Sequence, residues 1–149
     1  MNLDKALEIA IKAHKGQVDK AGEPYILHPL RVMNQFSDKV LMIIGVLHDV
    51  VEDSDTTLKD LTNEGFSEQI INALDCLTKR DNEEYPSFIE RVRTNPLAIQ
   101  VKIADIKDNL NISRLSQPLS GKDIERLQKY QIALLNLQKE NLITPNELT

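Results

Sequence analysis

The feature that most constrains the fold is an uninterrupted apolar run of eight residues, VLMIIGVL, from Val40 to Leu47. A helix over this run is apolar nearly all round, and Ser37 or Asp38 precedes it as a candidate N-cap. The run is far shorter than the roughly 20 residues that a membrane-spanning helix requires. The sequence therefore predicts a buried helix at the centre of the domain, which other elements must cover.

Helical periodicity continues through most of the chain. Residues 3–14 keep their apolar side chains on one broad stripe, and Pro29 and Pro96 suit first-turn positions of later helices. Strand alternation, internal repeats and low-complexity linkers are not found, and aromatic residues make up only 4% of the chain, which favours an aliphatic helical core. We expect one all-α domain over residues 1–149, a bundle of about six to eight helices.

The charge balance limits the partners that this chain can bind. It has 18 basic and 23 acidic residues, a net charge of -5, and no run of Lys or Arg long enough to follow a nucleic-acid backbone. We therefore expect no nucleic-acid partner. A small anionic molecule remains a candidate ligand, because a few cations or a metal ion can dominate one cleft.

The only cysteine, Cys76, excludes an internal disulfide and a zinc site built from several thiolates. A reducing cytoplasm fits this composition. The N-terminal segment MNLDKALEIAIKAHKG carries charges throughout and lacks the apolar stretch of a signal peptide. The sequence therefore predicts a cytoplasmic protein with no membrane partner.

The apolar run ends in four polar residues, His48, Asp49, Glu52 and Asp53. If the helix continues, each of the first two lies one turn from one of the second two, so the four side chains share one patch. Carboxylates at the negative C-terminal end of a helix cost roughly 0.3 to 1 kcal/mol each, and a bound cation would reverse that sign. A His beside an Asp, joined by other nitrogen and oxygen donors, suits an octahedral site for Mn²⁺, Fe²⁺ or a similar metal. A solvated helix end is the alternative.

Two further residues offer donors. His28 lies beside Pro29 in PYILHPL, and Asp105 interrupts an apolar helical face in VKIADIKDNL. A lone Asp among apolar residues is costly to bury unless it is paired or ligated. On spacing alone, both residues fit a structural role as well as a ligand role.

The order of these residues, H…HD…D, resembles that of the HD-domain metal-dependent phosphohydrolases. The segments AHKGQVDKAGEPYILHPLRV, LHDVVEDSD and VKIADIKDNL are similar to the successive motifs of the (p)ppGpp hydrolase domains of the RelA/SpoT homologues and of the small stand-alone alarmone hydrolases. The similarity runs from Ala13 to Arg114, most of the chain. It implies an HD-type helical bundle.

The resemblance also implies the roles of the polar residues. It implies a single Mn²⁺, or another divalent transition metal, held by His28, His48, Asp49 and Asp105. It implies that the catalytic residues, which serve the hydrolytic water, are Glu52 and Asp53. The family reaction releases the 3′-pyrophosphate of (p)ppGpp and leaves GDP or GTP.

Other residues of the same motifs are candidates for contacts with the phosphates or the ribose of a nucleotide substrate, with surface or packing roles as the alternative. They are Lys20, Tyr25, Lys102, Asn109 and Arg114. The neighbouring His14 is expected to make a structural hydrogen bond.

The chain departs from the family pattern at three positions linked to substrate recognition. Asp19 stands where an arginine usually packs on guanine, Ile106 replaces an arginine, and Ile112 replaces a threonine. The metal-ligand positions and the two catalytic acids match the pattern. The departures therefore affect recognition of the nucleotide base more than metal binding or hydrolysis.

The favoured interpretation is a Mn²⁺-dependent phosphohydrolase that acts on (p)ppGpp or a related nucleotide. The alternatives are an HD nucleotidase that acts on nucleoside monophosphates and a non-catalytic nucleotide-binding HD module that keeps the metal for folding. A helical stripe of Ile124, Leu127, Tyr130 and Leu134 is expected to pack within the monomer, with the face of a homodimer as the alternative.

Overall fold

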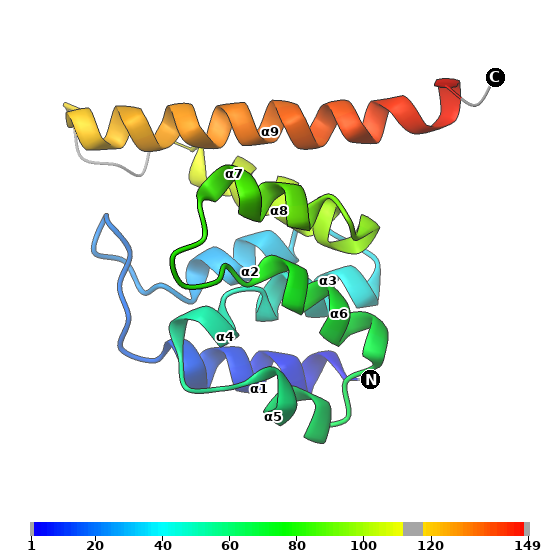
Figure 1. The fold of residues 1–149 in the computed structure, drawn as a ribbon. Coiled ribbons are helices and arrows are strands. Elements are labelled where there is room, and N and C mark those ends of the chain that lie inside the picture. Colours follow the sequence, from blue (N-terminus) through cyan, green and yellow to red (C-terminus); the bar gives the residue numbers. More distant parts are fainter. Residues whose placement is uncertain (1, 112–117, 148–149) are drawn as a thin grey trace.

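Every regular element in the described part of the chain is a helix, as a computed structural model shows (Figure 1). The backbone is described for residues 2–111 and 118–147, and the side chains of these ranges up to residue 139. The helices are α1 (Leu3–His14), α2 (Leu27–Met33), α3 (Lys39–Leu47), α4 (Val50–Asp53), α5 (Leu58–Asn63), α6 (Glu68–Leu77), α7 (Tyr85–Val92), α8 (Pro96–Asn109) and α9 (Gly121–Glu147). The predicted all-α fold is confirmed.

The predicted central helix is α3. Its residues Ile43, Ile44, Val46 and Leu47 are at most 1% exposed, and the helix packs against α1, α2, α6 and α8. Full burial of such an aliphatic side chain contributes about 1.5 to 3 kcal/mol. Packing on several sides makes α3 a rigid support for the polar residues that follow it.

Helices α2 and α3 approach closely at Gly45, which has no side chain. A Cβ atom at Gly45 would lie 3.3 Å from the Cα atom of Met33 and 3.4 Å from its backbone nitrogen. Because these are backbone atoms, they cannot rotate away as the end of a side chain can. The close packing brings His28 on α2 near His48, with ring centroids 5.3 Å apart.

The helix expected to continue through His48 and Asp49 is interrupted there. Helix α3 ends at Leu47 and α4 begins at Val50, so these two residues form the break. Glu52 and Asp53 therefore belong to α4, a separate single-turn helix. The sequence analysis placed these two acids at the C-terminal end of the apolar helix, and this prediction is wrong.

The capping signals predict most helix starts correctly. The predicted caps whose side chains accept a backbone N–H bond are Asp38, Thr57, Ser67, Asn95 and Ser120, and Asn2 also caps α1 in this way. Helix α7 is not anticipated by the sequence analysis, although Pro86 occupies its first turn, a position that proline favours.

Helix α9 lies across α7 and α8, on the side of the molecule opposite to α1 and α5 (Figure 1). Its residues Ala133 and Leu137 are buried. Tyr130 and Leu134 of the predicted stripe pack against the core, whereas Ile124 is 46% exposed. The stripe therefore packs partly within the monomer, and the homodimer stays a prediction.

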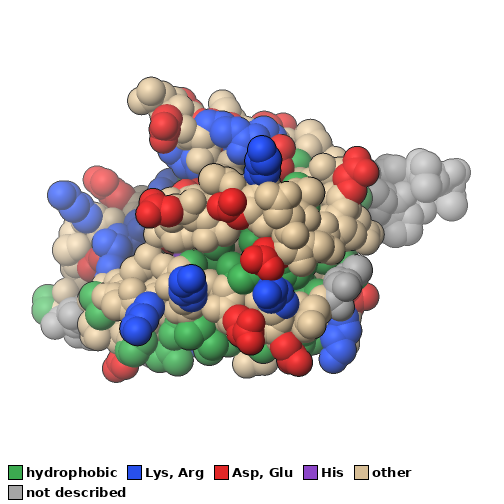
Figure 2. All heavy atoms as spheres, turned by 90° about the horizontal axis from the view of Figure 1, so that it is seen from below, with side chains coloured by type: hydrophobic (Ala, Val, Ile, Leu, Met, Phe, Trp, Pro, Cys, Tyr) green, Lys and Arg blue, Asp and Glu red, His purple; other side chains and the backbone are tan. Residues whose placement is uncertain are grey.

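Acidic and basic side chains are interspersed over the face shown in Figure 2. Among the described helices, none combines the length and the apolar character needed to cross a membrane. The single-domain organisation and the cytoplasmic location stay predictions.

Candidate metal centre and catalytic cavity

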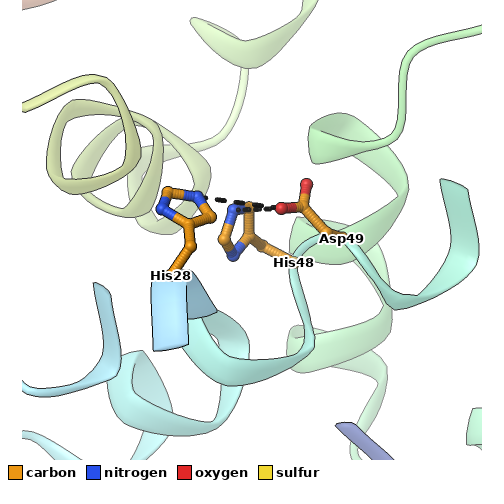
Figure 3. Close-up of side chains that lie close together, drawn as sticks. All are labelled: His28, His48 and Asp49. Atoms are coloured by element: carbon orange, nitrogen blue, oxygen red, sulfur yellow. Dashed lines mark ion pairs between the residues drawn. The ribbon is translucent and has the colours of Figure 1, made fainter. Parts of the chain in front are cut away.

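The four predicted metal ligands come together from α2, the α3–α4 break and α8. Three of them, His28, His48 and Asp49, face one another in Figure 3, and their candidate ligand atoms lie within 4.8 Å of one another. The Nε2 atom of His48 lies 3.1 Å from Asp49 Oδ2 and 3.3 Å from Asp105 Oδ1. The Nε2 atom of His28 lies 2.8 Å from Asp105 Oδ1 and 3.8 Å from Asp49 Oδ2. The sequence analysis thus named residues that are close in space.

These spacings fit a shared divalent cation. Two donors that bind one metal at about 2.1 Å in adjacent octahedral positions are roughly 3 Å apart. The Nδ1 atom of His48 donates a hydrogen bond to the carbonyl of Gly45 at 2.6 Å, so the neutral ring carries its lone pair on Nε2. That Nε2 atom is buried and has no hydrogen-bond partner among the described residues. A metal ion would satisfy an atom that is otherwise costly to bury.

Without a metal, protons on the two histidines balance the charges of the neighbouring carboxylates. Burial alone would lower the pKa of His28, but hydrogen bonds to Asp105 and Asp108 outweigh burial and raise this pKa to about 9. The pKa of His48 is raised because Asp49 and Asp105 outweigh its burial. The pKa values of these two carboxyl groups stay below their usual range despite burial, because cationic groups surround them. The carboxylates are therefore ionised at neutral pH.

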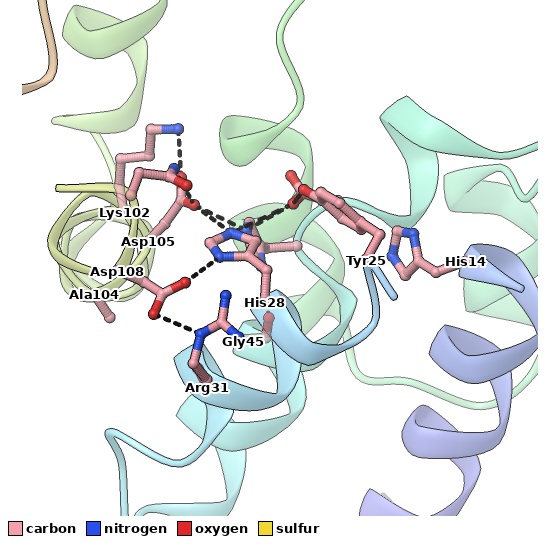
Figure 4. Close-up of polar contacts among 12 residues, drawn as sticks. His14, Tyr25, His28, Arg31, Gly45, Lys102, Ala104, Asp105 and Asp108 are labelled. Carbon is pink, nitrogen blue, oxygen red and sulfur yellow. Dashed lines mark hydrogen bonds and ion pairs between the residues drawn. The ribbon is translucent and has the colours of Figure 1, made fainter. Parts of the chain in front are cut away.

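Asp108, which the sequence analysis missed, orients His28. Its Oδ2 atom accepts a hydrogen bond from His28 Nδ1 at 2.6 Å, and its Oδ1 atom accepts one from Arg31 Nε at 2.8 Å (Figure 4). A carboxylate in this position holds a ligand imidazole in the tautomer that turns Nε2 toward a metal. The available signal was its position one turn after Asp105 on α8.

Three predicted substrate contacts are bonded to the ligand carboxylates. The Tyr25 hydroxyl donates to Asp49 Oδ2, and Lys102 Nζ donates to Asp105 Oδ2 at 2.8 Å (Figure 4). Asn109 Nδ2 donates to Asp105 Oδ1 at 3.2 Å. Each of these side chains therefore orients a ligand, whatever it does for a substrate.

The cluster opens into a cavity of about 650 Å³, a size typical of small-molecule sites. Every predicted site residue in the described part of the chain lines it except His48, which lies behind the wall. Arg114 falls outside the described residues. The cavity therefore brings ligands, acids and candidate substrate contacts to one space.

The two predicted catalytic acids occupy different environments in this cavity. Burial, followed by the charges of Asp49 and Glu52, raises the pKa of Asp53 to about 6. Glu52 Oε1 accepts a hydrogen bond from the backbone N–H of Lys79 at 2.9 Å. Asp53 therefore lies in a buried, negatively charged environment, whereas Glu52 is held in place by a backbone hydrogen bond.

Asp19, the first departure from the family pattern, has a local structural role. Its Oδ1 atom accepts hydrogen bonds from the backbone N–H groups of Ala21 at 2.9 Å and Glu23 at 3.0 Å. The carboxylate thus stabilises the loop beside the cavity. Ile106 is fully buried, and Ile112 lies outside the described residues.

His14 makes the structural hydrogen bond that was expected, from Nδ1 to Gln17 Oε1 at 2.8 Å. Its ring packs beside that of Tyr25, with centroids 5.1 Å apart. Gln17 Nε2 donates to the backbone carbonyl of Asp53 at 2.9 Å. This arrangement ties the end of α1 to α4.

The cavity wall opposite the metal centre is aromatic and cationic. The sequence analysis did not assign this wall to the site. The side chains on this wall come from α7, α9 and the segment after α6, and include Lys79, Tyr85, Phe88, Arg126, Lys129 and Tyr130. Residues so far apart in the sequence meet only through the packing of α9, so no local pattern predicts them.

Comparisons with known proteins agree with the fold and the motifs. No protein-family model matches the chain. Over 120 residues it is 32% identical to a guanosine-3′,5′-bis(diphosphate) 3′-pyrophosphohydrolase of Aquifex aeolicus, a match that covers 72% of this chain and 17% of that protein. Over 138 residues it is 30% identical to the bifunctional (p)ppGpp synthase/hydrolase SpoT of Escherichia coli, with 83% of this chain and 20% of that protein covered. The chain thus spans a fifth or less of the length of these two relatives.

A solved structure of a metazoan ortholog of SpoT that hydrolyzes ppGpp has the same fold. The TM-score is 0.76 at 21% sequence identity, and the match covers 91% of this chain and 84% of that one. Fold and site define an all-α domain with a candidate metal centre. The chain resembles the HD-type hydrolase domain of the RelA/SpoT homologues, as its motifs predict.

Proposed function

We propose that the chain is a metal-dependent phosphohydrolase that releases pyrophosphate from the 3′ position of (p)ppGpp. The observation that carries this proposal is the convergence of four nitrogen and oxygen donors at a cavity that Glu52 and Asp53 also line. The names of the relatives support (p)ppGpp as the substrate.

The proposed metal is Mn²⁺, held by His28, His48, Asp49 and Asp105. Two imidazoles and two carboxylates form a donor set for an octahedral first-row metal, as opposed to a tetrahedral thiolate zinc site. When bound, such a metal lowers the pKa of a coordinated water and polarises a phosphoryl oxygen.

The two acids handle the attacking water in this proposal. The pKa of Asp53, about 6, leaves its carboxylate mostly ionised at neutral pH and able to accept the proton. Glu52 is anchored through one oxygen to the N–H of Lys79, and its second oxygen orients the water. Asp53 thus acts as the base and Glu52 as its partner.

The substrate is held by residues of the same motifs in this proposal. They are Lys20, Tyr25, Lys102, Asn109 and Arg114. Because Tyr25, Lys102 and Asn109 also bond to ligand carboxylates, a change at any of them should affect both metal and substrate.

The test is hydrolysis by the purified protein reconstituted with Mn²⁺, with products separated by chromatography. We expect pyrophosphate with GDP or GTP from (p)ppGpp, no release by Asp49→Ala, and unchanged release by the control Asp81→Ala, an exposed residue. Release of phosphate from nucleoside monophosphates alone would instead identify a nucleotidase. Bound metal without turnover of any nucleotide would identify a non-catalytic module.

A further inference from the structure

The cavity wall opposite the metal centre concentrates positive charge. Its cations, from α9 and the segment after α6, are Lys79, Arg126 and Lys129. A fourth cation, Lys102 of α8, lies between this wall and the candidate ligand Asp105. The far wall therefore carries the opposite charge to the carboxylates around the candidate metal site.

Carboxylates neutralise two of these cations. Lys102 Nζ lies 2.8 Å from Asp105 Oδ2, and Arg126 Nη2 lies 2.8 Å from Asp123 Oδ1. No ion pair connects Lys129 to a carboxylate in the part of the chain that the structure describes. Lys129 thus contributes positive charge that no neighbouring acid cancels.

The surroundings of Lys129 disfavour its charge. Although this residue is exposed, its pKa is lowered first by partial burial at the cavity wall and then by the nearby charges of Lys102, Arg126 and Lys79. Repulsion among like charges in a partly enclosed cavity costs free energy, which a bound anion would recover.

Two aromatic rings fix the position of this ammonium group. Lys129 Nζ lies 4.5 Å from the ring centroid of Tyr85 and 5.3 Å from that of Tyr130. Cation–π contacts at these distances hold the ammonium in place at the cavity wall. The ring faces that Lys129 covers are not open to a nucleotide base, so this wall is better suited to an anionic group than to stacking.

We propose that Lys129, held by Tyr85 and Tyr130, binds a second phosphate group of the substrate, one that is not hydrolysed. This inference rests on the proposed phosphohydrolase function, since the reacting phosphate is placed at the metal centre. It assigns the cavity to nucleotides that carry phosphate groups at two separate positions. Nucleoside monophosphates lack the group that Lys129 recognises.

The kinetic test pairs a variant with a substrate that lacks the second group. The Mn²⁺-loaded enzyme is assayed with ppGpp and with guanosine 3′-diphosphate, which has a free 5′-hydroxyl. For Lys129→Gln we expect KM for ppGpp to rise on the order of tenfold with kcat little changed, and KM for guanosine 3′-diphosphate to stay the same. Lys129→Arg keeps the charge and should retain most of the affinity for ppGpp.

The matched control is Lys122→Gln, which removes an exposed lysine of the same helix that does not line the cavity. It should leave both KM values unchanged. An equal loss with both substrates, or no loss with either, in Lys129→Gln would overturn the inference.

A binding measurement keeps this inference separate from the proposed function. Calorimetry on the Mn²⁺-loaded protein compares GDP, which carries a 5′-diphosphate, with guanosine. Lys129→Gln should weaken GDP binding on the order of tenfold and leave guanosine binding unchanged. If the wild-type protein hydrolyses neither nucleotide, the proposed function fails, whereas the GDP titration still decides the role of Lys129. Equal GDP affinity in the wild type and the variant would refute that role.

Discussion

The two walls of the cavity are built in different ways. At the metal-centre wall, His48 and Asp105 are 2% and 4% exposed, and hydrogen bonds fix each candidate ligand. At the α9 wall, Lys129 is exposed and is placed by ring contacts. The first wall has the rigidity that a metal shell requires, and the second has the openness that suits substrate selection.

The largest effect should come from removing a ligand at the rigid wall. For His48→Gln we expect kcat to fall on the order of 10³-fold, because charge stabilisation by the metal is worth several kcal/mol. Metal content should fall in parallel, as measured by inductively coupled plasma mass spectrometry. Arg126→Gln on the α9 wall should keep full metal content, and circular dichroism checks that both variants are folded. Full metal content in His48→Gln would contradict the assignment.

The next effect concerns Asp108, which supports a ligand without being one. Asp108→Asn weakens the hold on His28 Nδ1, so we expect metal affinity to fall by about 10- to 100-fold. A competition titration with a fluorescent chelator measures it. The matched control is Asp123→Asn, which disrupts a carboxylate–cation pair on α9 and should leave metal affinity unchanged. If the two variants lowered the metal affinity equally, the metal site would not depend on the metal-centre wall alone, which would contradict the account.

The sequence reveals the metal-centre wall because its chemistry lies in short motifs. His48 and Asp49 adjoin the apolar run, and the order H…HD…D joins them to His28 and Asp105. The break after α3 was not predicted, since no Gly or Pro lies between Leu47 and Val50 and only tertiary contacts reveal it. Asp108 could have been predicted from its position one turn after Asp105, but the sequence analysis did not assign it.

The α9 wall could not be predicted in the same way. Tyr85 and Lys129 belong to helices far apart in the sequence, and their contact depends on how α9 crosses α7. An amphipathic stripe on a helix indicates which face packs, but it does not identify the helix that receives it. Contacts between distant surfaces of this kind require the structure.

The close packing of α2 and α3 can be tested through Gly45. Gly45→Ala places a Cβ atom 3.3 Å from the Cα atom of Met33, so we expect a loss of about 1 to 3 kcal/mol in the free energy of unfolding. Urea denaturation measures it. At Gly121→Ala, on α9, a Cβ atom meets nothing within 4 Å, and the change should be below about 0.5 kcal/mol. A larger loss at Gly121 would show that α9 is the more tightly packed region.

The two walls should respond to pH in opposite directions. The pKa of His28, about 9 without metal, lies above its usual value, so its imidazole is protonated at pH 7 and must lose this proton to bind a metal. Metal affinity should therefore rise by about tenfold per pH unit for each displaced proton, up to about pH 9. GDP binding at the α9 wall should weaken at alkaline pH, because the pKa of Lys129 is lowered by burial and by nearby cations.

The raised pKa of His28 also makes the free energy of unfolding of the metal-free protein depend on pH. Because the pKa of His28 is raised on folding, its stabilising contribution is complete below pH 6.5 and is lost as pH rises through about 9. Chelator titrations over this pH range measure the metal affinity, and urea denaturation measures the free energy of unfolding. Metal affinity that does not change with pH would contradict the protonated state of His28.

The central claim is that four side chains from three segments hold one metal ion. The most direct measurement is anomalous scattering from crystals grown with Mn²⁺. We predict one strong peak about 2.2 Å from the Nε2 atoms of His28 and His48 and from a carboxylate oxygen of Asp49 and of Asp105. A peak at another place in the cavity, or none at full metal supply, would contradict the claim.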